Sequence, residues 1–264
     1  MLGLSRTEKR WRWAACGKHP VAGDYFCLGH SFPTARIFAD WMEKGYPSLS
    51  GKDAELAGAA TACGWRFWAA GEKRNLVCGL VRDSYDSFGR PFPLLVVGEG
   101  PMGAWEESWE SVPSACERAW SYIEYCVTKS IRDLKQLETE ILNTPSPSAD
   151  WMDNGGLPSV SLEPASTLSG NALDVVVPVY QGAEYDVFQL NAEHSVGKID
   201  AVTVLHRLLK NRQPAVPKAF FVGGDFERTC AVRFNRPLRY ADFSTLWSAP
   251  RMEAGCFHPT SLSR

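Results

Sequence analysis

The chain of 264 residues lacks any long apolar run of the roughly 18 residues that a membrane-spanning helix needs. Its start also lacks the apolar segment of a secretory signal, because the charges between Ser5 and Trp11 are followed by mixed sequence. We therefore expect a cytoplasmic protein that does not insert into a membrane.

The sequence contains eight cysteines but lacks any Cys-x-x-Cys pair. Most of these cysteines lie in apolar runs, as Cys78 does in the segment 76–80. Such positions are typical of buried thiols in a reducing compartment. We therefore expect buried, reduced cysteines and no disulfide framework.

No nucleotide or metal motif is complete. Gly17 and Lys18 resemble the end of a phosphate-binding loop, but Arg12 stands where that motif needs glycine and His19 replaces its hydroxyl residue. The one cluster of possible metal ligands has no zinc spacing, so we expect no metal and no cofactor. Its members are Cys16, His19, Asp24, Cys27 and His30.

Charge is distributed unevenly along the chain. Residues 196–264 contain 11 Lys and Arg against 5 Asp and Glu, whereas residues 1–195 are acidic overall. The excess of cations represents either solvated helix faces or a basic surface that meets an acidic partner. Nucleic acid is disfavoured as a partner, because the basic residues are not interleaved with aromatic ones.

Aromatic and apolar runs bounded by turn residues predict strands in the first half. They cover residues 11–16, 65–69, 76–81 and 94–97. Residues 72–75 predict a hairpin between the second and third of these runs. Successive strands joined by turns favour an antiparallel sheet, so the fold class is α/β (α+β), with about five such strands flanked by helices.

Two helices are predicted in the first half. Ser31 is a plausible N-cap, with Pro33 in the first turn of the helix that follows. Ser114 and Glu117 have the spacing of a capping box and predict one long helix that ends near Asn143.

The Pro-rich and Ser-rich stretch after Asn143 predicts a boundary, because prolines cannot continue a helix. We divide the chain into a domain at 1–143, a linker at 144–171 and a smaller α/β part at 172–264. Strands in the last part are expected at 173–180, 185–190, 219–222 and 229–234, and helices at 198–209 and 240–247.

Two polar stretches in the first half, 17–26 and 83–94, form the candidate site. Asp24 is expected to accept hydrogen bonds from Arg90 or from loop amides, and so to lock the two loops together. Lys18 is expected to be exposed and free to contact a partner. With Ser84 and Asp86 these residues make a polar site that either binds a partner or builds the fold.

The same stretches carry a family resemblance. The first matches a G-K-x-P-x-x-G-D-F motif at Gly17, Lys18, Pro20, Gly23 and Asp24. The second matches P-S-x-D-x-x-G-R-x-F-P-L at Ser84, Asp86, Gly89, Arg90, Phe92, Pro93 and Leu94, with Asp83 in place of the first proline. With the Trp65-Arg66-Phe67 strand and Trp41 in a helix between them, the chain resembles the type VI secretion system-associated TagF family, also called ImpM.

This resemblance implies a longin-like or profilin-like first domain and a non-catalytic, cytoplasmic regulator. Members of the family restrain assembly or firing of the type VI secretion system after translation, and one route is contact with a forkhead-associated scaffold protein. A forkhead-associated scaffold is therefore the expected partner. Two alternatives stay open: a small hydrolase that uses Cys16, His19 and Asp24, and a structural adaptor of the secretion apparatus.

Overall fold

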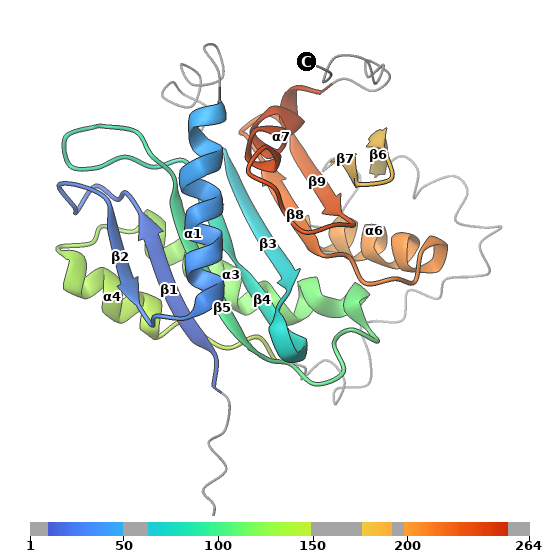
Figure 1. Cartoon of the computed structure of the whole chain (residues 1–264), viewed down its shortest axis with the longest axis horizontal. Helices are drawn as coiled ribbons and strands as arrows, with labels where there is room; N and C mark the ends of the chain where they lie inside the picture. Colours follow the sequence, from blue (N-terminus) through green and yellow to red (C-terminus); the bar gives the residue numbers. More distant parts are fainter. Residues whose placement is uncertain (1–9, 50–62, 149–175, 192–197, 253–264) are drawn as a thin grey trace, which may run out of the picture.

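The structure is a computed structural model that describes residues 10–49, 63–148, 176–191 and 198–252. The described residues form one nine-stranded antiparallel sheet in the order β2-β1-β5-β4-β3-β8-β9-β7-β6 (Figure 1). The strands are β1 Arg12–Gly17, β2 Phe26–Gly29, β3 Gly64–Ala70, β4 Asn75–Arg82, β5 Leu94–Pro101, β6 Val176–Gln181, β7 Tyr185–Leu190, β8 Ala219–Gly224 and β9 Thr229–Phe234.

Helices cover both faces of this sheet (Figure 1). One face packs against α1 (Pro33–Gly45) and α7 (Asp242–Ser248). The opposite face packs against α3 (Val112–Thr128), α4 (Leu134–Leu142) and α6 (Lys198–Arg212). Alternate residues of each strand enter the two cores, as Trp65 and Phe67 do on one side and Trp68 on the other.

The two halves of the chain meet where β3 pairs with β8. Phe67 lies opposite Phe221 in this pairing, and their stacked rings are 5.4 Å apart between centroids. The ring centroid of Trp41 in α1 lies 5.9 Å from that of Phe221 and 5.2 Å from that of Phe243 in α7. One aromatic cluster therefore joins elements from both halves.

The expected number of strands applies to the first half alone. β1 to β5 come from residues 12–101, but the second half adds β6 to β9 to the same sheet. The sheet thus has nine strands and not about five, because β8 continues the ladder at the edge that β3 leaves open. The linker lies mostly outside the described residues, so the proposed boundaries stay a prediction.

The single long helix predicted for 114–143 is wrong. α3 ends at Thr128, where Lys129 takes an extended conformation, and α4 begins at Leu134. The Asp133 carboxylate caps α4 by accepting a hydrogen bond from the Gln136 amide at 2.8 Å. The apolar spacing continues through the break, because both helices pack on the same face of the sheet.

Two smaller differences concern residues 26–33. The N-cap of α1 is Phe32 and not Ser31, and no side chain caps it, although Pro33 opens the helix as predicted. No strand was predicted at residues 26–29, but they form β2 at one edge of the sheet. The Gly29 amide of this edge strand donates to Glu138 of α4 at 3.2 Å.

The remaining strands and helices of the second half lie close to their predicted positions. β6 pairs with β7 and forms the other edge of the sheet, with Pro178 at an irregularity in the pairing. None of the helices in the described ranges is long and apolar enough to cross a membrane.

Replacing the fully buried Phe221 by alanine should lower the free energy of unfolding by about 3–5 kcal/mol, because it leaves a cavity between the halves. Urea denaturation of the full chain measures this change. Phe226→Ala is the control, because that side chain is 91% exposed and should change stability by no more than about 0.5 kcal/mol. Equal effects of the two variants would contradict the role given to the β3–β8 pairing.

Candidate functional site

The two predicted loops lie side by side at one end of the sheet, at the upper left of Figure 1. The Lys18 amide donates to the Pro93 carbonyl at 3.3 Å, and the Ser87 amide donates to the Ala22 carbonyl at 2.8 Å. Gly17 makes this approach possible, because its φ is +128° and a Cβ there would collide with the Pro93 carbonyl oxygen. Backbone contacts therefore hold the loops together.

Asp86 is the centre of the site. Its side chain has no exposed surface. Oδ1 accepts hydrogen bonds from the amides of Phe88 and Arg90, both at 3.0 Å. Oδ2 lies 2.9 Å from Nζ of Lys18 and accepts a hydrogen bond from Nε of Arg90 at 2.7 Å. One buried carboxylate thus binds Lys18 of the first loop and closes the turn at 86–90.

These contacts decide the charge state of Asp86. Burial by itself raises the pKa of the carboxyl group, but Lys18, Arg90 and the two amides stabilise the ionised form. Their combined effect is larger, and the pKa of Asp86 lies well below its ordinary value. Asp86 is therefore a stable anion whose charge is matched by its neighbours.

Asp24 has a smaller part than expected. Its carboxylate lies 3.7 Å from Arg90 in an ion pair whose side chains are 75% and 52% exposed, and such pairs contribute little. Arg90 makes a closer contact to the same loop, donating to the Gly23 carbonyl at 2.6 Å. Of the two kinds of donor expected, the closer one is a loop amide, since Asp24 accepts a hydrogen bond from the Tyr25 amide at 2.8 Å.

Lys18 and Ser84 also differ from their expected roles. The side chain of Lys18 is only 13% exposed, because its ammonium group turns inward to Asp86. It is therefore not the free surface cation that the sequence led us to expect. Ser84 contributes its backbone, whose carbonyl accepts a hydrogen bond from the Phe92 amide at 3.0 Å.

Sequence reasoning missed the residues that this network presents to solvent. Phe88 is 74% exposed and Tyr85 is 54% exposed. Phe88 lies at the tip of the turn, and the guanidinium of Arg90 is 5.4 Å from the centre of its ring. The only sequence signal was an aromatic residue inside an Asp-Ser-Phe-Gly turn, where polar residues are more common.

Asp83, which replaces the proline of the family motif, connects this loop to the second half. Its carboxylate accepts hydrogen bonds from the Cys63 amide and from Nε1 of Trp247 in α7, both at 2.8 Å. Burial raises the pKa of Asp83, because these neutral donors offset the loss of water only in part. Asp83 thus has a specific structural role at the position where the family motif has proline.

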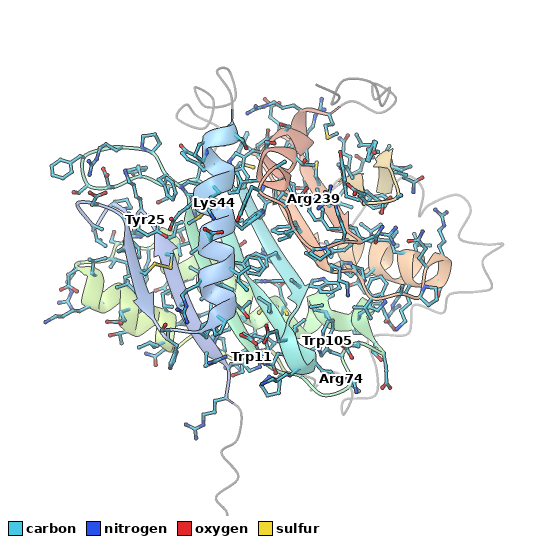
Figure 2. All side chains as sticks on the ribbon, in the orientation of Figure 1. Trp11, Tyr25, Lys44, Arg74, Trp105 and Arg239 are labelled. Atoms are coloured by element: carbon cyan, nitrogen blue, oxygen red, sulfur yellow. A yellow bond between two sulfur atoms is a disulfide. The ribbon has the colours of Figure 1, made fainter. Side chains whose placement is uncertain are left out.

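The candidate residues of the hydrolase alternative also lie near this end of the sheet. Cys16 and Cys27 face each other across β1 and β2 and form a disulfide, visible as a yellow bond in Figure 2. This pair contradicts the expectation of reduced cysteines. The spacing of the cysteines in the sequence did not indicate this pair. The two residues meet because the loop between β1 and β2 places Cys16 opposite Cys27. The other cysteines of the described ranges are free and buried, as expected: Cys63, Cys78, Cys116, Cys126 and Cys230.

His19 is buried, and its ring is influenced by the backbone of Val127 in α3. Its Nδ1 accepts a hydrogen bond from the Val21 amide at 3.3 Å. Burial and the nearby charge of Arg82 lower the pKa of this imidazole. Within the described residues, no group of three or more His, Cys, Asp or Glu side chains is arranged to hold a metal ion.

Comparisons with known proteins agree with the motifs. Residues 14–142 match the family model described as the TagF N-terminal domain, type VI secretion system-associated. The fold is similar to the crystal structure of PA0076 from Pseudomonas aeruginosa PAO1, with a TM-score of 0.51 and 14% sequence identity. That similarity covers 89% of this chain and 93% of the other, and at such low identity it concerns the fold alone. No curated protein sequence matches the chain.

Asp86→Asn should destabilise the chain near neutral pH, because Lys18 and Arg90 lose the charge that matches theirs. The pKa of Asp86 is lower in the folded state than its unfolded value of about 3.9. Its contribution is therefore present above about pH 4 and lost as the pH falls further. Urea denaturation at several pH values should show a weaker loss on acidification for Asp86→Asn than for the wild type.

Asp24→Asn is the matched control for this experiment, since Asp24 is exposed and its one ion pair among the described residues is the long contact to Arg90. The asparagine carbonyl can still accept the hydrogen bond from the Tyr25 amide. It should change stability less than Asp86→Asn at neutral pH. If the two variants were equally destabilised, Asp86 would not be the centre of the network.

The disulfide can be tested by counting free thiols before and after reduction. The unfolded chain, prepared without reductant, should show two more titratable thiols after treatment with a dithiol reductant than before it. The difference should vanish in Cys27→Ser. A persistent difference in that variant would place the bridge between other cysteines.

Proposed function

Residues 14–142 belong to the TagF N-terminal domain family, which is associated with type VI secretion, and from this membership we propose a regulator that acts by binding. The protein restrains the assembly or firing of a type VI secretion system after translation. It does so in the cytoplasm, by occupying a forkhead-associated scaffold protein and withholding it from the apparatus.

The observation that carries the proposal is the exposed aromatic tip of the loop at 84–93. Phe88, Tyr85 and Arg90 project from a turn that Asp86 holds by four contacts. Aromatic residues and arginine dominate the binding energy of protein interfaces, above all when they are held in place before binding. Here the polar motif residues build the turn, and the aromatic residues contact the partner.

We assign no catalytic step to this site. The sulfur of Cys16 is bonded to that of Cys27 in the disulfide, so Cys16 has no free thiol. Nδ1 of His19 accepts a hydrogen bond from the amide of Val21 in its own loop. A hydrolase would need a thiolate with a base within hydrogen-bonding reach. The exposed tip therefore supports binding better than it supports hydrolysis.

Phe88→Ala should weaken binding of the full chain to the forkhead-associated scaffold by about tenfold or more, as expected for a central aromatic anchor. Isothermal titration calorimetry with the purified scaffold measures the dissociation constant. Phe226→Ala removes an even more exposed ring from the β8–β9 turn and should leave the constant unchanged. An effect of Phe226→Ala alone, or no binding by the wild type, would refute the assigned contact.

The regulatory part of the proposal is tested in the host. Deleting the gene should increase secretion through the type VI system, and the wild-type chain should restore the restraint. Phe88→Ala at the same protein level should fail to restore it. Loss of secretion on deletion would contradict restraint and would instead support a structural adaptor.

A further inference from the structure

A groove lies on the α1 face of the sheet, separate from the two-loop site. It has a volume of about 820 Å³ and runs between α1 and the segment 237–240 that leads into α7. The ends of β3 and β8 form its remaining wall, with Ala69, Ala70 and Ala219. Small side chains at these positions leave the space open.

Hydrogen bonds fix the two walls of the groove relative to each other. Nε1 of Trp41 donates to the Arg239 carbonyl at 3.0 Å. The Tyr240 hydroxyl donates to Asp40 at 2.8 Å and accepts a hydrogen bond from Lys44 at 3.1 Å. Lys44 lies on α1 and Arg239 on the segment beside it (Figure 2). The groove is therefore formed before anything binds.

The lining combines apolar surface with exposed rings and side chains. Trp41 and Phe38 lie beneath it and are buried, whereas Ile37 is 62% exposed and Tyr240 is 46% exposed. Ile37 points away from the core although it lies on a helix whose other apolar residues are mostly covered. An exposed apolar residue beside a groove of this size offers a place for a large apolar side chain.

The rim of the groove is positive. Arg36 and Lys218 are exposed, and neither has an ion-pair partner among the residues that the structure describes. Arg239 is 61% exposed and is paired only with Glu184, outside the groove. The one acidic residue of the lining, Asp40, is already paired with Lys44 at 2.7 Å. The groove therefore carries uncompensated positive charge.

From this combination we propose that the groove binds an acidic peptide segment of a partner protein. One large apolar side chain of the peptide fills the space beside Ile37 and Trp41. Asp or Glu residues on either side of that anchor pair with Arg36 and Lys218. Exposed cations and a preformed apolar cleft are complementary to such a segment, and they repel a basic one.

The groove contains none of the residues of the two-loop site, so this proposal stands independently of the proposed function. Nucleic acid is less well matched, since Tyr240 is the only exposed aromatic ring in the lining and stacking needs several. A symmetric contact between the grooves of two copies is likewise less well matched, because both grooves present the same positive charge.

The test begins with a displayed library of short random peptides selected on the immobilised full-length chain. Selection is repeated on Ile37→Asp, which changes an exposed side chain and should leave the fold intact. Peptides enriched on the wild type but not on the variant should carry Asp or Glu beside Leu, Phe or another large apolar residue. Enrichment without this acidic bias, or no enrichment specific to the wild type, would overturn the proposal.

An enriched peptide is then synthesised with a fluorophore, and its affinity is measured by anisotropy. Arg36→Glu and Lys218→Glu should each weaken binding by about tenfold, and more at low salt. Lys135→Glu is the matched control, because Lys135 is exposed on α4 on the opposite face and should have no effect. Equal losses in all three variants would show only a response to net charge and would refute the site.

Sedimentation velocity on the full chain distinguishes a second copy as occupant. The wild type and Ile37→Asp should sediment alike. A wild-type dimer that Ile37→Asp disrupts would assign the groove to self-association and overturn the peptide proposal. A labelled single-stranded oligonucleotide in the anisotropy assay should not bind, and binding lost in Arg36→Glu would likewise overturn it.

Discussion

The antiparallel pairing of β3 with β8 is the interaction on which the architecture depends. It joins strands that are far apart in the sequence and makes one sheet from both halves of the chain. α1 packs over the join, where Trp41 contacts rings on β8 and α7. Without this pairing, the groove between α1 and the segment 237–240 would lose a wall, and Asp83 would lose its contact to Trp247. The two-loop site and the groove beside α1 therefore both depend on contacts between the halves.

Most strands could be predicted from the sequence, because aromatic and apolar runs bounded by turns are local signals. The join could not, since nothing in the segments 64–70 and 219–224 identifies them as partners. The break between α3 and α4 was missed for a different reason. Asp133 and Gln136 formed a capping signal, but the apolar spacing continued across it. Periodicity reports which face is buried, and it does not report whether the helix is continuous.

The candidate site was predicted in its residues and not in its organisation. The motifs placed Lys18, Asp24, Asp86 and Arg90 together, but the sequence gives no measure of burial. Burial makes Asp86, rather than Asp24, the shared acceptor and turns Lys18 inward. Phe88 went unnoticed because one exposed ring leaves no pattern. Residues that build a loop are thus easier to recognise than the residue that the loop presents.

The two edges of the sheet differ in sequence but resemble each other in effect. At β6 a proline interrupts the pairing, and it cannot donate a backbone hydrogen bond. At β2 the Gly29 amide is already bonded to Glu138 of α4. Each edge therefore offers an incoming strand at least one backbone donor fewer, which makes extension of the sheet less favourable at these positions. Recognition by side chains on loops and helices does not depend on these donors, so it is compatible with both edges as they stand.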